Sequence, residues 1–500
     1  MPQTAIFRCD ASAAIGGGHV VRCFTLAEEL QRRGWTCRLV SLPGTLAIVE
    51  PFAPRDVELV EHEQASDPRT LQALSPQGCD LLVVDNYALG SEFEGALEGW
   101  ASRRMVIDDI PNRQHQTDIV LDQTLGRTQT SYDDLVGSGT LRLLGTGFAL
   151  VRPAFARARR AALPRRESGH ELARILVGLG ATPQPEVVDL VLAGIAEADL
   201  AVEVHVLAGT GPIASLVYDG GPLVVHEATD TVHRLMADCD LAIGAGGGSA
   251  WERCSVGLPS LLLRVADNQN HVVDALSGAG AAIDLGLAAD VSSAKVAAEL
   301  RSLVRHPARR AELARNAARA CDGLGVRRVA GMIAPRRARD GQPVTLRPAT
   351  AADVRLTFAW QQVPEIRHHS PNAQPQTWTE HTAWFTKRTE DPSGGPFSII
   401  EYGRRPVGVL RLDETSAVGL DVPSDSQQEG GSFVVSVFVD PEFHRIGIAG
   451  AVLNAGRDLL PDARFYARVM PDNAASHRLF QTVGYRPALP GLYVSGPNLA

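Results

Sequence analysis

The chain has 500 residues, more than one ordinary hydrophobic core accommodates, so two or three domains are expected. Its 48 basic residues against 57 acidic ones give a net charge of -9, which argues against a nucleic-acid partner. Seven scattered cysteines without a CxxC pair argue against a disulfide scaffold and a zinc site. The first residues do not form a signal peptide, and no apolar run is long enough to cross a bilayer. These features predict a cytoplasmic enzyme that binds no membrane.

A glycine-rich turn near the start of the chain separates an apolar strand, residues 5–9, from a helical pattern. Its three consecutive glycines, Gly16, Gly17 and Gly18, let the backbone come close to a ligand. His19 follows at the helix start, where the positive end of the helix dipole favours a neutral imidazole. Such an imidazole is suited to be a general base, and a capping histidine beside a tight turn explains the pattern equally well.

Up to about residue 155, short apolar strands alternate with helical patterns, which is typical of a parallel sheet with crossover helices. The expected strands are residues 37–42, 81–85, 104–108 and 119–122. Aspartates recur where these strands end, at Asp85, Asp108, Asp109 and Asp122. The carboxyl ends of such strands line the ligand crevice of an open α/β sheet. Aspartate is also a common turn residue, but its repetition at successive strand ends favours a functional interpretation.

The polar, proline-bearing residues 157–170 are interpreted as a crossing between two sheets, after which the strand–helix alternation restarts. The expected strands are residues 172–178, 201–208, 223–226 and 261–265, and the expected helices are residues 231–237, 293–303 and 307–320. A second glycine-rich turn leads through Gly247 and Gly248 to Ser249 and Glu252, a geometry that can bind phosphate on free amides. The paired turns predict an α/β fold with two Rossmann-like lobes, residues 1–156 and 157–334, in a glycosyltransferase-B arrangement around a nucleotide-linked substrate.

Residues 335–342 have no apolar period and are expected to be a linker. A smaller α+β domain, residues 343–500, is expected after it. Its predicted strands are residues 344–347, 397–402, 407–413 and 432–439, and its predicted helices are residues 351–360 and 377–386.

Residues 3–334 resemble the UDP-sugar hydrolase family of pseudaminic acid biosynthesis. The motifs that carry the resemblance are Asp10…Gly16-x-Gly18-His19-x-x-Arg22, Asp85-x-Tyr87, Asp108-Asp109, Gly178-x-Gly180-Ala-Thr182, Ser249-x-x-Glu252 and Asn268-Gln269. Asn86 stands where that family usually has histidine, and the second turn is more glycine-rich than in some members, which leaves the sugar itself open.

The resemblance implies a fold like that of the peptidoglycan GlcNAc transferase, with water as the acceptor. Water would attack the anomeric carbon of UDP-2,4-diacetamido-2,4,6-trideoxy-β-L-altropyranose with inversion, releasing UDP. It implies a general base at His19, with Asp10 or Arg22 shaping its surroundings. The implied substrate-side residues are Tyr87, Asp85, Asp109, Asn268 and Gln269, and the implied UDP-binding residues are Gly247, Gly248, Ser249 and Glu252.

No metal is expected if backbone amides stabilise the departing diphosphate. The alternative is a divalent ion on the strand-end carboxylates Asp85, Asp108 and Asp109.

The last domain resembles the GNAT acetyltransferases, whose cosubstrate is acetyl-CoA. The acyl-CoA motif spans Val437, Val439, His444, Arg445, Ile446, Gly447, Ile448 and Ala449, and the closing motif runs from Asn473 and Ser476 to Tyr485. The resemblance implies loop amides facing the pyrophosphate at a helix N-terminus, with glycine where the phosphate is nearest. His444 replaces the usual Arg or Gln, which leaves Arg445 as the charge partner.

Within that superfamily, Trp360, Arg367, His381 and Trp384 resemble positions of the enzymes that acetylate UDP-4-amino sugars in the same pathway. The resemblance implies acetylation of the C4 amine before hydrolysis, with Arg367 and His381 on the sugar. Phe480 occupies the usual place of an acid tyrosine; Tyr485 and Tyr466 are candidates for that role, and each fits a packing role equally well.

Two other functions remain open at this point. The first half is either a glycosyltransferase that needs an added acceptor, or a nucleotide-sugar-binding lobe without turnover. The intact turn from Gly16 to His19 favours catalysis over the second option.

Overall fold

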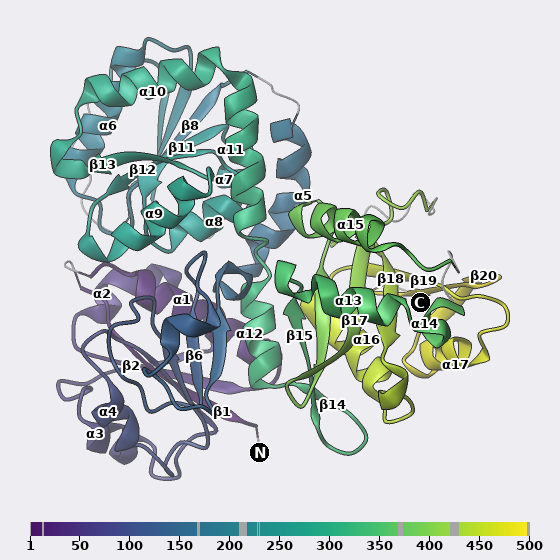
Figure 1. The fold of residues 1–500 in the computed structure, drawn as a ribbon. Helices are drawn as coiled ribbons and strands as arrows, with labels where there is room; N and C mark the ends of the chain where they lie inside the picture. The colour runs from purple at the N-terminus through teal and green to yellow at the C-terminus, as the bar shows by residue number, and fades with distance from the viewer. Residues whose placement is uncertain are drawn as a thin grey trace. The chain divides into compact units, whose positions relative to one another are not determined.

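The computed structural model describes residues 2–12, 15–167, 171–209, 218–227, 229, 231–368, 374–391, 393–420 and 430–497. The chain divides into two compact units, Met1–Val326 and Arg327–Ala500. Both are drawn in Figure 1. Among the helices of the described residues, none is long and apolar enough to span a membrane.

The first unit begins with a seven-stranded parallel sheet in the order β3-β2-β1-β4-β5-β6-β7. Its strands are β1 (Thr4–Cys9), β2 (Thr36–Ser41), β3 (Glu58–Glu61), β4 (Leu81–Asp85), β5 (Arg104–Ile107), β6 (Ile119–Asp122) and β7 (Leu141–Leu144). Its helices are α1 (Gly18–Arg32), α2 (Thr45–Val49), α3 (Pro68–Leu74) and α4 (Ser91–Gly95). The strands predicted from residues 37 to 122 are confirmed to within one residue. Edge strands β3 and β7 were not predicted because both are short, contain charged residues and lack an apolar run.

The second sheet of this unit is also parallel, with the order β10-β9-β8-β11-β12-β13. Its strands are β8 (Arg174–Gly178), β9 (Glu203–Leu207), β10 (Leu223–His226), β11 (Leu241–Ala245), β12 (Ser260–Arg264) and β13 (Ile283–Leu287). Its helices are α5 (Pro153–Glu167), α6 (Pro185–Ala198), α7 (Val232–Asp238), α8 (Ser249–Ser255), α9 (Asn270–Gly278), α10 (Ser293–Arg305) and α11 (Pro307–Ala320). The predicted pair of doubly wound sheets is confirmed.

The crossing between the two sheets that was predicted for residues 157–170 is made largely by helix α5, which was not predicted, and residues 168–170 lie outside the described part. The predicted lobe boundary at residue 156 falls inside this helix. Arginine is a good helix former, and the arginines of α5 cap other helices. Arg159 Nη1 donates to the Ser255 carbonyl at 2.7 Å, and Arg166 Nη2 donates to the Met236 carbonyl at 2.6 Å. These carbonyls lie near the ends of α8 and α7.

The second unit is built on an eight-stranded mixed sheet in the order β14-β15-β16-β17-β18-β19-β21-β20. Its strands are β14 (Arg336–Arg337), β15 (Pro343–Pro348), β16 (Phe397–Tyr402), β17 (Arg405–Glu414), β18 (Ser432–Val439), β19 (Arg464–Arg468), β20 (Arg486–Leu489) and β21 (Leu492–Ser495). Its helices are α13 (Val354–Gln361), α14 (Pro364–His368), α15 (Trp378–Glu390), α16 (Ile448–Leu459) and α17 (Ala474–Thr482), while α12 (Gly325–Ile333) runs across the division between the units.

Residues 335–342 are not an extended linker, because they form a hairpin in which β14 pairs antiparallel with β15. The Ala338 amide donates to the Gln342 carbonyl at 3.0 Å, and the Ala338 side chain packs in the core of the second unit. Arg336 forms an ion pair with Asp458 at 2.7 Å. These tertiary contacts fix a segment whose sequence carries no helical or strand period.

Strands β18 and β19 run parallel and pair only over Ser432, Phe433 and Val434 of β18. Beyond Val434, the printed pairing of β18 is with β17 on its other side. The strands therefore diverge toward the carboxyl end of β18, where the loop to α16 begins. Predicted cofactor residues Val437 and Val439 lie on this divergent part.

Candidate active site

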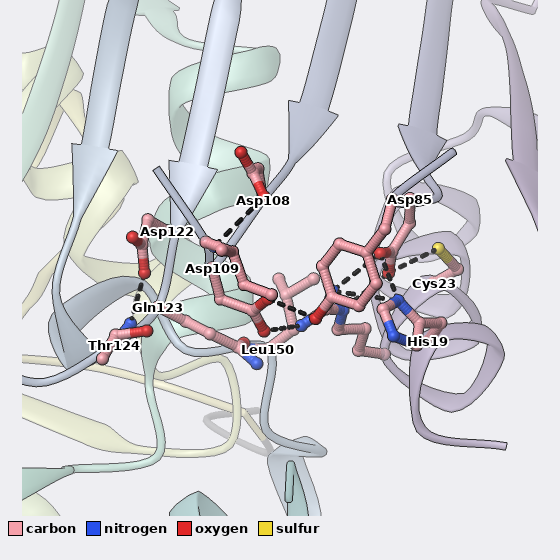
Figure 2. A network of polar contacts seen from close by, with 12 residues as sticks. His19, Cys23, Asp85, Asp108, Asp109, Asp122, Gln123, Thr124 and Leu150 are labelled. Carbon is pink, nitrogen blue, oxygen red and sulfur yellow. Dashed lines mark hydrogen bonds and ion pairs between the residues drawn. The ribbon is translucent and has the colours of Figure 1, made fainter. Parts of the chain in front are cut away.

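The first site forms where the parallel strands of the first sheet end. Asp85 closes β4, and its backbone partner in β1 is Cys9, so β4 ends beside the glycine-rich turn that leads into α1. Figure 2 shows His19, Asp85 and Asp109 gathered at these strand ends. The predicted convergence of strand-end carboxylates thus holds for Asp85 and Asp109.

His19 lies in the first turn of α1 and is 8 % exposed. Its Nδ1 is 2.6 Å from Asp85 Oδ1. Because a carboxylate only accepts hydrogen bonds, we assign the ring proton to Nδ1, which donates to Asp85. In the neutral ring, Nε2 then carries the free lone pair. This assignment gives His19 the tautomer and the orienting partner of a general base.

Arg22 lies one turn further along α1 and joins the two strand-end carboxylates. Its Nε and Nη2 donate to Asp85 at 2.6 and 2.7 Å, and its Nη1 donates to Asp109 Oδ2 at 2.9 Å. Burial alone would raise the pKa of Asp85, but Arg22 and His19 outweigh it and hold that pKa below its ordinary value. The pKa of Asp109 is lowered in the same way by Arg22 and Tyr87 against burial. Both carboxylates are therefore ionised at neutral pH.

Tyr87 contacts both Asp109 and the imidazole of His19. Its hydroxyl donates to Asp109 Oδ1 at 2.5 Å, and its ring meets the ring of His19 edge-on with centroids 4.9 Å apart. Burial, followed by the charge of Asp109, raises the pKa of Tyr87. The guanidinium of Arg113 lies over the Tyr87 ring, 5.6 Å from its centroid. Tyr87 is thus a neutral hydrogen-bond donor fixed against the predicted base.

Asp10, predicted to be catalytic, contacts other groups. Its carboxylate accepts from Arg8 Nη1 at 2.6 Å, from the Leu42 amide at 2.7 Å and from Asn86 Nδ2 at 2.7 Å. It therefore ties together the ends of β1, β2 and β4, and the carboxylate on His19 is Asp85 instead. Asn86, where the resembled family usually has histidine, takes part in this tie.

The strand-end carboxylates proposed as an alternative metal site each face a cation of the chain. Asp85 and Asp109 both form ion pairs with Arg22, whereas Asp108 Oδ2 lies 3.0 Å from His115 Nε2. Among the residues that the structure describes, no group of three or more His, Cys, Asp or Glu side chains is placed to hold a metal ion. The carboxylates here serve as partners of arginine and histidine.

The second glycine-rich turn precedes α8 and is braced from within its own lobe. Gln269 Oε1 accepts from the Gly246 amide at 3.1 Å, so this predicted substrate residue supports the turn. The carboxylate of Glu252, predicted for the ribose, forms an ion pair with Arg152 at 2.9 Å. A Cβ on Gly248 would meet no atom within 4 Å, and one on Gly247 would meet only Gln269, at 3.8 Å.

Ser249, the first residue of α8, accepts from Arg253 Nη1 at 3.1 Å. Asn268 lies in the short 3-10 turn Asp267–Gln269 that follows β12, and it is half-buried. The structure therefore brings Asn268, Gln269 and the glycine-rich turn to one end of the second sheet.

The second candidate site is the loop between β18 and α16. Gly447 caps α16 with φ +92°, a conformation that favours glycine, and Arg445 has φ +68°. His444 Nε2 hydrogen-bonds the Val439 carbonyl at 2.8 Å, so the imidazole braces the loop backbone. Ile448 and Ala449 begin the helix. The binding of a pyrophosphate by the backbone amides of this loop stays a prediction.

The hairpin before β15 contacts this loop. The Arg339 amide donates to the Ile446 carbonyl at 2.8 Å, and Arg339 Nη1 lies 3.4 Å from the Arg445 carbonyl oxygen. A Cβ on Gly447 would lie 2.9 Å from Arg339 Cγ. This contact was not predicted, because residues 335–342 were expected to be a linker.

Three side chains predicted for the acetyltransferase site are packed elsewhere. Tyr485 is 3 % exposed in the core, edge-on to Phe480, and burial raises its pKa to about 12. His381 is fully buried and hydrogen-bonds Thr357 at 3.1 Å. Arg367 donates to Gln361 Oε1 at 2.8 Å. The packing interpretation therefore describes Tyr485, and the contacts of His381 and Arg367 with a sugar stay predictions.

Asn473 and Ser476 of the closing motif cap α17, because Asn473 Oδ1 accepts from the Ser476 amide at 3.0 Å. A side-chain cap of this kind accounts for both residues without a ligand, and their predicted cofactor contacts stay a prediction.

Residues 344–486 match the acetyltransferase (GNAT) domain family. The chain is 24% identical over 338 residues to the spore coat polysaccharide biosynthesis protein SpsG of Bacillus subtilis, a match covering 65% of this chain and 96% of that protein. It is 24% identical over 150 residues to the UDP-2,4-diacetamido-2,4,6-trideoxy-beta-L-altropyranose hydrolase of Campylobacter jejuni, covering 30% of this chain and 52% of the hydrolase.

Among solved structures, MurG of Acinetobacter baumannii is similar with a TM-score of 0.47 at 13% identity, covering 67% of this chain and 99% of MurG. The spinosyn forosaminyltransferase SpnP is similar with a TM-score of 0.46 at 15% identity, covering 66% and 99%. The sheet topology and the family match together confirm two Rossmann-like lobes followed by a GNAT acetyltransferase domain.

Proposed function

We propose that this protein is a bifunctional enzyme that modifies a UDP-linked amino sugar in two consecutive steps. The second unit would transfer acetyl from acetyl-CoA to the C4 amine of a UDP-4-amino-4,6-dideoxy-N-acetyl sugar. The first unit would then hydrolyse the UDP-2,4-diacetamido-2,4,6-trideoxy sugar, releasing UDP for nonulosonic (pseudaminic) acid biosynthesis. The GNAT match supports the first step, and the names of the Bacillus and Campylobacter relatives support sugar chemistry in the first unit.

The observation that carries the hydrolase proposal is the contact between His19 Nδ1 and Asp85 Oδ1 at 2.6 Å. Through this contact the carboxylate stabilises the imidazolium that forms when Nε2 takes a proton from water. Arg22 holds Asp85 through two hydrogen bonds and so fixes the partner of the base. Such an orienting network is characteristic of groups that transfer protons.

In the proposed hydrolysis, His19 Nε2 removes a proton as the water oxygen forms a bond to the anomeric carbon. The bond between that carbon and the diphosphate oxygen breaks, and the electron pair leaves with UDP. Attack from the face opposite to UDP inverts the anomeric configuration. The amides of Gly247, Gly248 and Ser249 would stabilise the negative charge that develops on the diphosphate.

In the proposed acetyl transfer, the nitrogen of the sugar amine forms a bond to the thioester carbonyl carbon and loses a proton, the C–S bond breaks, and the CoA thiolate takes up a proton. The loop from Arg445 to Ala449 would hold the CoA pyrophosphate on its amides at the start of α16. Tyr485 is not placed as the acid, because it lies in the core.

Incubation of the pure protein with the UDP-4-amino sugar, with and without acetyl-CoA, tests both steps. Free CoA and UDP are followed by chromatography or NMR. We expect CoA first and UDP only after acetylation. His19→Ala should stop UDP release while CoA release continues. CoA without UDP at any time would contradict the hydrolase assignment and favour a transferase awaiting an acceptor or a binding lobe.

A further inference from the structure

A second cluster of buried charged side chains adjoins the first candidate site and has no role in the steps described so far. His115, in the loop from β5 to β6, places Nε2 3.0 Å from Asp108 Oδ2 and Nδ1 2.7 Å from Glu94 Oε1. The side chains of all three residues are 0 % exposed. A histidine between two buried carboxylates is costly to desolvate, so its presence calls for a reason beyond packing.

The hydrogen bonds of this cluster require a proton on both ring nitrogens. Carboxylate oxygens only accept, and a neutral imidazole has a single N–H to donate. Only an imidazolium satisfies Asp108 and Glu94 together. Burial by itself lowers the pKa of His115, but its hydrogen bonds to these two carboxylates outweigh burial and raise the pKa to about 9. His115 is therefore a fixed cation at neutral pH.

The cation closes the loop that holds the candidate site. Asp108 begins this loop and His115 lies seven residues further along it, so the 3.0 Å contact closes residues 108–115 into a ring. Between them, Asp109 binds the Tyr87 hydroxyl and Arg113 lies over the Tyr87 ring. Loss of the closure would loosen the backbone that carries both groups, although Asp109 would keep its ion pair with Arg22.

Neighbouring groups anchor the closure to the rest of the lobe. Glu94 Oε2 accepts from the Gln116 amide at 2.6 Å, and Arg113 forms an ion pair with Asp108 at 3.2 Å. The Tyr132 hydroxyl donates to the Asp108 carbonyl at 2.6 Å. The guanidinium of Arg104 also faces the cluster, because its Nη1 donates to the Glu94 carbonyl at 3.1 Å. Of these groups, the imidazolium is the one expected to lose a proton between pH 7 and 10, and with one N–H left it can donate to only one of the two carboxylates.

We infer that His115 is a positioning residue for the first candidate site: as an imidazolium bridging Glu94 and Asp108, it closes the loop that aims Asp109 and Arg113 at Tyr87. The inference deepens the proposed hydrolase function and rests on it for its kinetic consequence. His115 itself touches no reacting atom. Its consequence is that the site is intact while His115 is charged and loosens as the pH rises through about 9.

The first experiment measures the proton directly and needs no turnover. The full-length protein labelled with 15N-histidine is titrated from pH 6 to 10.5 by NMR, and the His115 signals are identified by their loss in His115→Gln. We expect both ring nitrogens protonated at pH 7 and a transition near pH 9, with the His19 ring signals shifting at the same pH. A neutral His115 ring at pH 7, or His19 signals that ignore its titration, would overturn the inference.

The second experiment uses UDP release from the diacetamido sugar over the same pH range. Glu94→Gln keeps the shape of the side chain but removes the negative charge of one carboxylate beside the imidazolium, so His115 should lose its proton at lower pH. The pH at which kcat falls on the alkaline side should decrease by the same amount, while KM changes little. A structural role alone would lower activity without changing the pH of this alkaline fall. An unchanged pH of the fall would therefore contradict the inference.

His115→Gln should lower kcat by about 10- to 100-fold, because a small misplacement of a positioning group has effects of this size. His62→Gln, a histidine of the same lobe outside the cluster, is the matched control and should behave as wild type. If His115→Gln does not fold, Glu94→Gln carries the test. If the wild type releases no UDP at all, the proposed function fails, whereas the NMR titration still decides whether His115 is charged and coupled to His19.

Discussion

The two candidate sites of this protein are built from different parts of the chain. In the first unit, buried side chains form the site: His19, Arg22, Asp85, Tyr87 and Asp109 contact one another directly. In the second unit, the proposed site is the backbone of one loop, and the nearby polar side chains brace that loop or cap helices. A side-chain site depends on the identity of its residues, whereas a backbone site depends on conformation. Substitutions should therefore affect the two sites in different ways.

The largest expected effect separates the two activities. His19→Ala removes the proposed base and should lower the rate of UDP release by about 10²- to 10⁴-fold, the usual contribution of a general base. CoA release should stay at the wild-type rate, because the acetyltransferase loop lies in the other unit. Rates of both products from one reaction mixture provide the measurement. Equal loss of both products would mean that the two units share a site.

Asp85→Asn sharpens the same comparison, because it keeps the shape of the site and removes its charge. The amide leaves Arg22 short of a carboxylate and no longer stabilises the imidazolium of His19. We expect UDP release to fall by about 100-fold, the scale of a lost positioning contact. Kinetics at saturating substrate, with Asp80→Asn as a control aspartate of the same sheet, measure the effect.

The low pKa of Asp85 also has a consequence for stability. A carboxylate whose folded pKa is depressed contributes stability above its unfolded pKa of about 3.9, and that contribution is lost as the pH falls through the folded pKa. The wild-type first unit should therefore lose stability on acidification more steeply than Asp85→Asn. Urea unfolding at pH 7, 4 and 3 measures this difference; parallel curves for the two proteins would count against the ion pair.

Gly447→Val is the counterpart in the second unit. Valine is strained at φ +92°, and its Cβ would lie 2.9 Å from Arg339 Cγ. A distortion of about 1–2 kcal/mol predicts a roughly tenfold rise in KM for acetyl-CoA. UDP release from substrate that is already acetylated should not change. Gly450→Ala, a small change inside α16, is the control, and an unchanged KM for Gly447→Val would argue against this loop as the acetyl-CoA site.

The smallest expected effect concerns the hairpin before β15. Arg339→Ala keeps the backbone hydrogen bond to Ile446 but removes the side chain that packs on Gly447 and approaches the Arg445 carbonyl. An exposed contact of this kind contributes at most about 1 kcal/mol, so KM for acetyl-CoA should rise by up to about fivefold. Arg337→Ala, on the same hairpin, is the control. Equal effects of the two substitutions would indicate general charge attraction instead of support for the loop.

The architecture could be predicted from the sequence to a large extent. Continuous apolar runs identified the central strands of the first two sheets because such strands are buried on both faces. Edge strands β3 and β7 escaped because one side of an edge strand faces no neighbour and tolerates charge. Helix α5 escaped because its arginines find their partners, the carbonyls near the ends of α7 and α8, about 70 to 100 residues further along the chain.

The sequence by itself determined that His19 follows a glycine-rich turn and that aspartates close the parallel strands, because local spacing fixes both features. Which carboxylate serves which cation was decided only by the tertiary structure. Asp85, 66 residues from His19, lies on the imidazole, whereas Asp10, nine residues away, binds Arg8 and the ends of two strands. The same holds for His381 and Tyr485, whose motifs predicted ligand contacts and whose side chains are buried. Periodicity encodes which elements form, but the partner of a charged side chain depends on the packing of elements distant in the chain.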